Sequence, residues 1–311
     1  MVKNLGLNVL ASFRCHLHSG QKTLENCMHA DKRTAELMEC LITGYSDAQS
    51  LGGFARAIRN SCRLKASYAR HCEELDSVLQ KASTGGWSFA PQRFSTVLQV
   101  SETLCLNMGP ALKTLQEAVV RGGQNRDWAM RVLQTLNPEN MLLLALLCEL
   151  CKVAQRYVHR WDRSADKTTL ADTALEFENF KLEANRLFSF RSLDGDLQQP
   201  LVLSPDCTSG MPQLLRASYN LLQQEAVIHE GMMVYFRPKW DEKTNREAMA
   251  KELGAIQNIL THFVDGINLW HNTAVASAFA PLDVSTWAKR CSDDTLPGPH
   301  KENSILNQGS S

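Results

Sequence analysis

Cysteine and histidine are the residues of this chain whose chemistry could be metal-binding or catalytic. Cys148 and Cys151 are separated by two residues, a spacing found in many zinc and redox sites. A structural zinc site needs about four ligands, and no second pair stands at a useful spacing from these two. We therefore interpret Cys148 and Cys151 as small residues on adjacent faces of a buried helix.

The histidines give no stronger signal. His16 and His18, with Cys15 beside them, are a metal-binding candidate that no downstream carboxylate pattern supports. His229 and His271 lie on or beside apolar helical patterns, and neither can be paired with a nucleophile from the sequence. The chain also contains no GxxxxGK[ST] phosphate loop and no GxGxxG motif after a strand. We therefore predict a non-enzymatic protein without catalytic residue, metal or cofactor, and keep an enzyme in a helical shell as a minor hypothesis.

The composition indicates a globular protein with a balanced charge. The chain has 311 residues, 44% of them hydrophobic and 21% charged, which is enough to bury a core. Its 33 Lys and Arg residues equal its 33 Asp and Glu residues, so no global positive field favours nucleic acid. The 10 cysteines are scattered through helical sequence. They are typical of reduced thiols in a cytoplasmic protein.

The elements that carry these residues are predicted to be helices. Apolar residues recur every three or four positions, which is the period of a helix that buries one face. We predict an all-α fold in which long antiparallel helices share apolar seams, packed as a bundle or as a coiled-coil dimer. Alternating strand sequence is absent, with PLVLS (200–204) as the one doubtful stretch. The predicted seams lie at 51–81, 94–119, 164–188, 215–236 and 249–274.

Local signals predict where some of these helices begin and end. Pro110 predicts a break near 107–110, since proline removes a backbone donor and clashes with the preceding turn. Asn137 is predicted to cap a helix whose first residue is Pro138. Residues 21–44 are predicted to form one helical unit.

The most apolar run is MLLLALLCELC (141–151). It is shorter than the roughly 20 residues of a membrane span. Glu149 also interrupts it, so we predict a buried helix.

The predicted organisation is a single helical domain over 21–280, with a long loop at 191–212 and a mostly disordered tail at 281–311. Residues 1–20 are a candidate amphipathic N-terminal segment. Leu5, Val9 and Phe13 lie at helical spacing and are membrane-insertion candidates. The other interpretation, which we favour, is that residues 2–18 form the first core helix.

Several stretches together resemble the BAR and F-BAR family of membrane-curving dimers. FARAIRNSCRLKASYARHCEELDSVLQK looks like the family's early helix, with an apolar seam and a basic segment. FSTVLQVSETLCLNMGPALKTL, after Trp87, looks like the next long helix, and Leu175 to Phe188 resembles the later arm. GAIQNILTHFVDGINLWHNTA resembles the last segment, including its aromatic-His pair Trp270-His271.

This resemblance implies a homodimeric scaffold that binds anionic membrane surfaces in trafficking or remodelling, as a cytoplasmic or peripheral membrane protein. Basic side chains on one face would attract anionic lipid by roughly 1 kcal/mol each. The alternative is a helical adaptor or tether that binds protein partners without lipid contact. The lipid-binding candidates are Arg56, Arg59, Arg63, Arg70, Lys152, Arg156, Arg160 and Arg163.

Overall fold

The computed structural model describes residues 16–43, 53–74, 87, 94–123, 125–159, 170–189, 201–203, 212–223 and 241–271. Within these ranges the protein is all-α and contains no strand, which confirms the all-α part of the predicted fold class. The helices are α1 (His16–Ala30), α2 (Lys32–Met38), a π-helix (Glu39–Thr43), α3 (Phe54–Asn60), α4 (Cys62–Glu74), α5 (Phe94–Leu106), α6 (Met108–Arg121), α7 (Arg126–Thr135), α8 (Pro138–His159), α9 (Leu170–Phe188), a 3₁₀ helix (Leu201–Leu203), α10 (Gln213–Leu222) and α11 (Glu242–His271).

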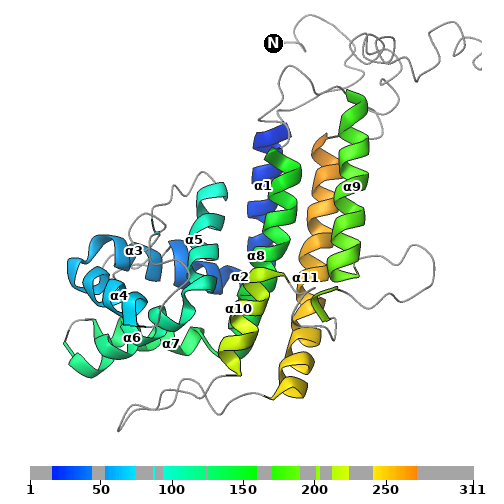
Figure 1. The fold of residues 1–311 in the computed structure, drawn as a ribbon. Coiled ribbons are helices and arrows are strands. Elements are labelled where there is room, and N and C mark those ends of the chain that lie inside the picture. The colour runs from blue at the N-terminus through cyan, green and yellow to red at the C-terminus, as the bar shows by residue number, and fades with distance from the viewer. Residues whose placement is uncertain are drawn as a thin grey trace, which may run out of the picture.

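The long helices α1, α8, α9 and α11 lie side by side (Figure 1). Close contacts between these helices show whether they run parallel or antiparallel to one another. Gly20, near the start of α1, lies against Val158 at the end of α8, where an added Cβ would stand 2.7 Å from Val158 Cγ2. Arg33, just beyond α1, reaches Glu252 in the first part of α11 at 2.7 Å. Helix α1 is therefore antiparallel to both α8 and α11.

The shorter helices α3 to α7 form a second group, in which α4 packs on α6 and α6 packs on α7 (Figure 1). Trp87 lies at its centre and is fully buried. Its ring meets Phe54 and Tyr68 edge-on, with ring centroids 5.4 and 5.2 Å apart. Helices α5 and α10 pack against α8 and so join the two groups.

Helix α8 is the most buried element. Every residue from 141 to 151 is buried, as predicted for this apolar run. Glu149 does not face solvent. Its Oε1 accepts a hydrogen bond of 2.8 Å from the backbone N–H of Leu214 and so caps the first turn of α10, which has no cap of its own from Pro212. No helix among the described residues is long and apolar enough to cross a membrane.

Two local predictions are wrong, and one doubtful stretch is resolved. The predicted continuous helix over 51–81 breaks at Ser61, which has extended backbone and whose hydroxyl accepts from the N–H of Leu64 at 3.3 Å. The unit at 21–44 breaks at Asp31, whose carboxylate caps α2 through the N–H of Thr34 at 2.7 Å. Within the doubtful stretch at 200–204, Leu201–Leu203 forms a 3₁₀ helix, in agreement with the predicted all-helical fold. At both breaks the position that would continue the apolar seam is occupied by a residue whose side chain can cap a helix, Ser61 in one case and Asp31 in the other.

Other local predictions are confirmed. The break predicted near 107–110 falls at Asn107, between α5 and α6, and Pro110 lies in the first turn of α6, where its missing N–H costs little. Asn137 caps α8 by accepting from the N–H of Asn140 at 2.8 Å.

Some predictions fall partly or wholly outside the described residues. Helix α1 begins at His16 and so spans the predicted boundary at 20. The predicted seam at 215–236 is described only to residue 223. The tail at 281–311, residues 1–15 and most of the 191–212 loop lie outside the described part of the chain.

Candidate interaction surfaces

The predicted lipid-binding residues are spread over both groups of helices. Arg56 and Arg59 are exposed on α3, and Arg63 and Arg70 are exposed on α4. Lys152 is half-buried on α8. Arg156 is exposed on the same helix. The remaining candidates, Arg160, Arg163, Leu5, Val9 and Phe13, lie outside the described residues.

Three of these cations pair with carboxylates of the same chain. Arg70 Nη2 lies 2.5 Å from Glu117 Oε2. Arg156 on α8 lies 2.5 Å from Glu183 on α9, and Lys152 lies 3.7 Å from the buried Glu149. An internal carboxylate offsets the charge that a cation offers to an anionic surface. These three residues are therefore weaker attractors of lipid than the sequence indicates.

A polar cluster joins α4 to α6 around one carboxylate, Glu117, whose side chain is 17% exposed. We call it the Glu117 cluster: Glu117, Ser67, Arg70, His71 and Arg121. Glu117 Oε2 accepts from the Ser67 hydroxyl and the Arg70 guanidinium and lies 3.0 Å from His71 Nε2. Its Oε1 pairs with Arg121. One acidic side chain thus holds donors from two helices.

The cluster keeps Glu117 ionised. Burial raises the pKa of its carboxyl, but the hydrogen bonds from Ser67, Arg70 and His71 and the charge of Arg121 together outweigh burial and lower that pKa to about 2. The hydrogen bond from His71 likewise lowers the pKa of the nearby Glu74, whose Oε2 lies 2.9 Å from His71 Nδ1.

Ser67, His71 and Glu117 are the residue types of a hydrolase triad, but their geometry is different. A triad places the serine hydroxyl on the histidine, and the carboxylate on the far side of that ring. Here the Ser67 hydroxyl donates to Glu117 itself, which is a charged, very weak base. A small hollow of about 20 Å³ lies beside the cluster, bordered by Arg63, Asn125 and Gly122. It has room for about one water molecule, and the contact between serine hydroxyl and histidine ring that a triad needs is not formed here.

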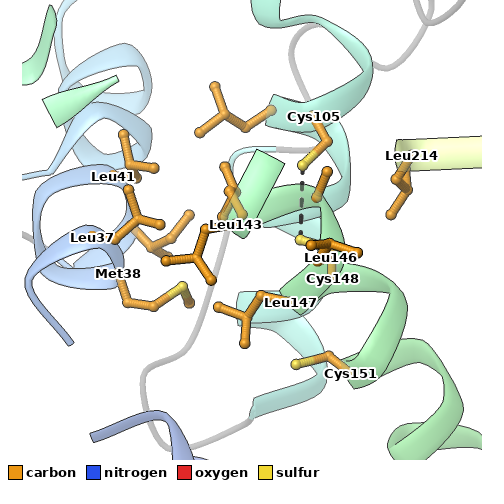
Figure 2. Close-up of a cluster of buried hydrophobic side chains, with 14 of the residues drawn as sticks. Leu37, Met38, Leu41, Cys105, Leu143, Leu146, Leu147, Cys148, Cys151 and Leu214 are labelled. Carbon is orange, nitrogen blue, oxygen red and sulfur yellow. Dashed lines mark hydrogen bonds between the residues drawn. The ribbon is translucent and has the colours of Figure 1, made fainter. Parts of the chain in front are cut away.

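The cysteines predicted to be buried lie between α5 and α8. Cys105 Sγ and Cys148 Sγ are 3.8 Å apart and surrounded by leucines (Figure 2). The hydrogen bond with Cys105 and burial raise the pKa of the Cys148 thiol, and burial raises the pKa of Cys151. The seven described cysteines are free thiols, and no group of three or more metal-ligating side chains exists among the described residues.

The outer face of α9 carries two large apolar side chains that face solvent. The inner face buries Phe177, Phe180 and Phe188, and Phe180 meets Phe263 of α11 at 5.3 Å between ring centroids. On the opposite side, Leu175 and Leu182 are 59% and 56% exposed. They are two turns apart and so share one face of the helix.

Charged and polar residues flank the two leucines. Glu178, Asn179 and Arg186 are exposed on the same side of α9. We call Leu175, Glu178, Asn179, Leu182 and Arg186 the α9 outer face. Helix α9 lies at the edge of the group of long helices (Figure 1). Val120 on α6 is the other large apolar side chain that is exposed among the described residues, and it stands alone.

This face was not among the sites predicted from the sequence. The seam predicted over 164–188 runs through Phe177, Ala184 and Phe188, which the structure buries. The missed signal was the pair Leu175 and Leu182, which repeat at seven residues on the side away from that seam.

No protein-family model, no curated protein and no solved structure matches this chain.

Proposed function

We propose that this protein is a non-enzymatic helical scaffold that binds protein partners through the α9 outer face. The observation that carries the proposal is the pair of leucines that α9 directs into solvent on one face, while its aromatic residues face the core. A second helix laid along this face would cover both leucines, a common mode of helix recognition.

The charge distribution favours this function over lipid binding. Arg70, Lys152 and Arg156 are already paired with Glu117, Glu149 and Glu183. Attraction to an anionic membrane depends on basic side chains whose charge is uncompensated near the surface.

Site-specific photo-crosslinking in cells would test the proposal. A photoreactive residue at position 175 is expected to form discrete protein adducts, and the same probe at position 120 on α6 is the matched control. The adducts are expected to vanish when Leu182→Glu is combined with the probe, because the glutamate breaks the apolar face. Equal adducts from both probes, or adducts that survive Leu182→Glu, would refute the proposal.

Binding to anionic membranes as a BAR-like dimer is the second candidate. It is supported by the exposure of Arg56, Arg59 and Arg63 on the neighbouring helices α3 and α4. Co-sedimentation with vesicles containing phosphatidylserine, at low salt, tests it. Binding that exceeds binding to neutral vesicles, and that falls in the triple variant with these three arginines changed to glutamine, would favour this candidate. Equal recovery with both vesicle types would exclude it.

A further inference from the structure

We propose that the partner of the α9 outer face is a second copy of this chain, paired antiparallel about Leu182. The inference deepens the proposed function and rests on it. It starts from the order of the residues along the face: Glu178 lies one turn before Leu182, and Arg186 lies one turn after it.

An antiparallel two-fold axis through Leu182 places each residue opposite the one at equal distance on the other side. Glu178 of each copy then faces the partner's Arg186, and this pair forms twice. Leu182 meets the partner's Leu182 at the axis, while Leu175 covers the end of the partner's α9 near Ser189. The face is thus complementary to itself in charge and in apolar contact.

Other pairings of the same face are opposed by charge. A parallel pair in register sets Glu178 against Glu178 and Arg186 against Arg186. An antiparallel pair that brings Leu175 against Leu182 places its axis beside Glu178, so two carboxylates meet there. Like charges directly opposite each other are destabilising. The Leu182-centred pairing is the one that joins opposite charges.

The residues of the face are available for this contact. Arg186 is exposed. Glu178 pairs with Lys181 of its own helix at 2.5 Å, and its side chain is 61% exposed. Exposed pairs of this kind contribute little and are easily exchanged for others. Phe177 and Phe180 on the opposite side of α9 are buried in the core, so they hold the helix with its outer face directed away from the core. One helix face is a small interface, so we expect a dissociation constant on the order of 10 µM.

Exchanging the charges at positions 178 and 186 tests the inference. Sedimentation equilibrium of the full chain is expected to show a monomer–dimer equilibrium. Glu178→Arg alone and Arg186→Glu alone are each expected to weaken it at least about ten-fold, because each places two like-charged pairs at the interface. The double variant is expected to return to within about three-fold of the original. An equimolar mixture of the two single variants is expected to form a mixed dimer, in which both pairs are again opposite.

Val120→Glu is the control, because it removes an exposed apolar side chain on α6 and should leave the equilibrium unchanged. A chain that stays monomeric at about 200 µM, or single variants that dimerise normally, or a double variant that does not recover would overturn the inference. A photoreactive residue at position 182 adds a test without charge changes, since it is expected to link to the α9 peptide of a second copy.

The outcomes separate the two proposals. Adducts from position 175 to other proteins, combined with a monomeric purified chain, would exclude the second copy and leave the proposed function standing. A dimer that follows the charge exchange supports both. Absence of any α9 adduct in cells together with a monomeric chain would overturn both.

Discussion

Glu117→Gln removes the charge around which α4 and α6 are joined while it keeps the size of the side chain. The lowering of the Glu117 pKa from 4.5 to about 2 measures how strongly the folded protein prefers the ionised form. At about 1.4 kcal/mol per unit, this shift corresponds to about 3 kcal/mol of folding free energy. Arg70 and Arg121 are 49% and 41% exposed, so solvent screens part of it. We expect a loss of about 1 to 2 kcal/mol at pH 7.

The pH dependence follows from the sign of the shift. The folded pKa is below the unfolded value, so the contribution of Glu117 is fully present above about pH 4.5 and is lost as the pH falls toward 2. The difference in unfolding free energy between the original chain and Glu117→Gln should therefore become smaller as the pH falls below about 4.5.

Urea unfolding followed by circular dichroism at several pH values measures this difference. Glu247→Gln is the matched control. Its side chain is 69% exposed and pairs with Lys243 at 3.9 Å, so we expect a change below about 0.5 kcal/mol at every pH. A carboxyl NMR titration gives the pKa of Glu117 directly. A value above about 4, or a variant as stable as the original chain at pH 7, would refute the reasoning.

Three further predictions concern packing and capping. Trp87→Ala should cost about 3 to 5 kcal/mol in urea unfolding, since it empties the fully buried space between Phe54 and Tyr68; a loss below about 1 kcal/mol would contradict this packing. Gly266→Ala should lower the melting temperature because its methyl group would overlap Thr23, whereas Gly254→Ala, with open space around it, should raise it slightly; equal shifts would contradict this difference. Asn137→Ala should cost about 1 kcal/mol by removing the cap of α8, and an unchanged unfolding midpoint would count against that cap.

The sequence predicted the helices well where a buried face repeats without competition. The apolar pattern of α11 places Met249, Ile256 and Phe263 in the core, as the structure does. The run at 141–151 was correctly assigned to a buried helix. These patterns succeed because the period of a helix and the burial of one face act along a single segment.

The sequence was less informative where one side chain can serve two roles. Ser61 fits the seam by spacing, but its hydroxyl caps α4 and the helix breaks there. Glu149 looked like an interruption of an apolar run. Its carboxylate instead caps α10, which begins more than sixty residues later. No local pattern encodes this contact, because its partner is brought close only by the packing of α10 on α8.

Contacts between residues distant in the sequence also explain why the basic residues alone did not identify the partner. Arg70 finds its carboxylate 47 residues away on α6, and Arg156 finds one 27 residues away on α9. Each pairing lowers the charge that the folded surface presents, and none can be read from composition. In contrast, the exposure of Leu182 follows from its position opposite the aromatic residues of its own helix. This position depends on one segment alone, so it can be read from the sequence as well as from the structure. The α9 outer face therefore gives a more specific test of the partner than the basic residues do.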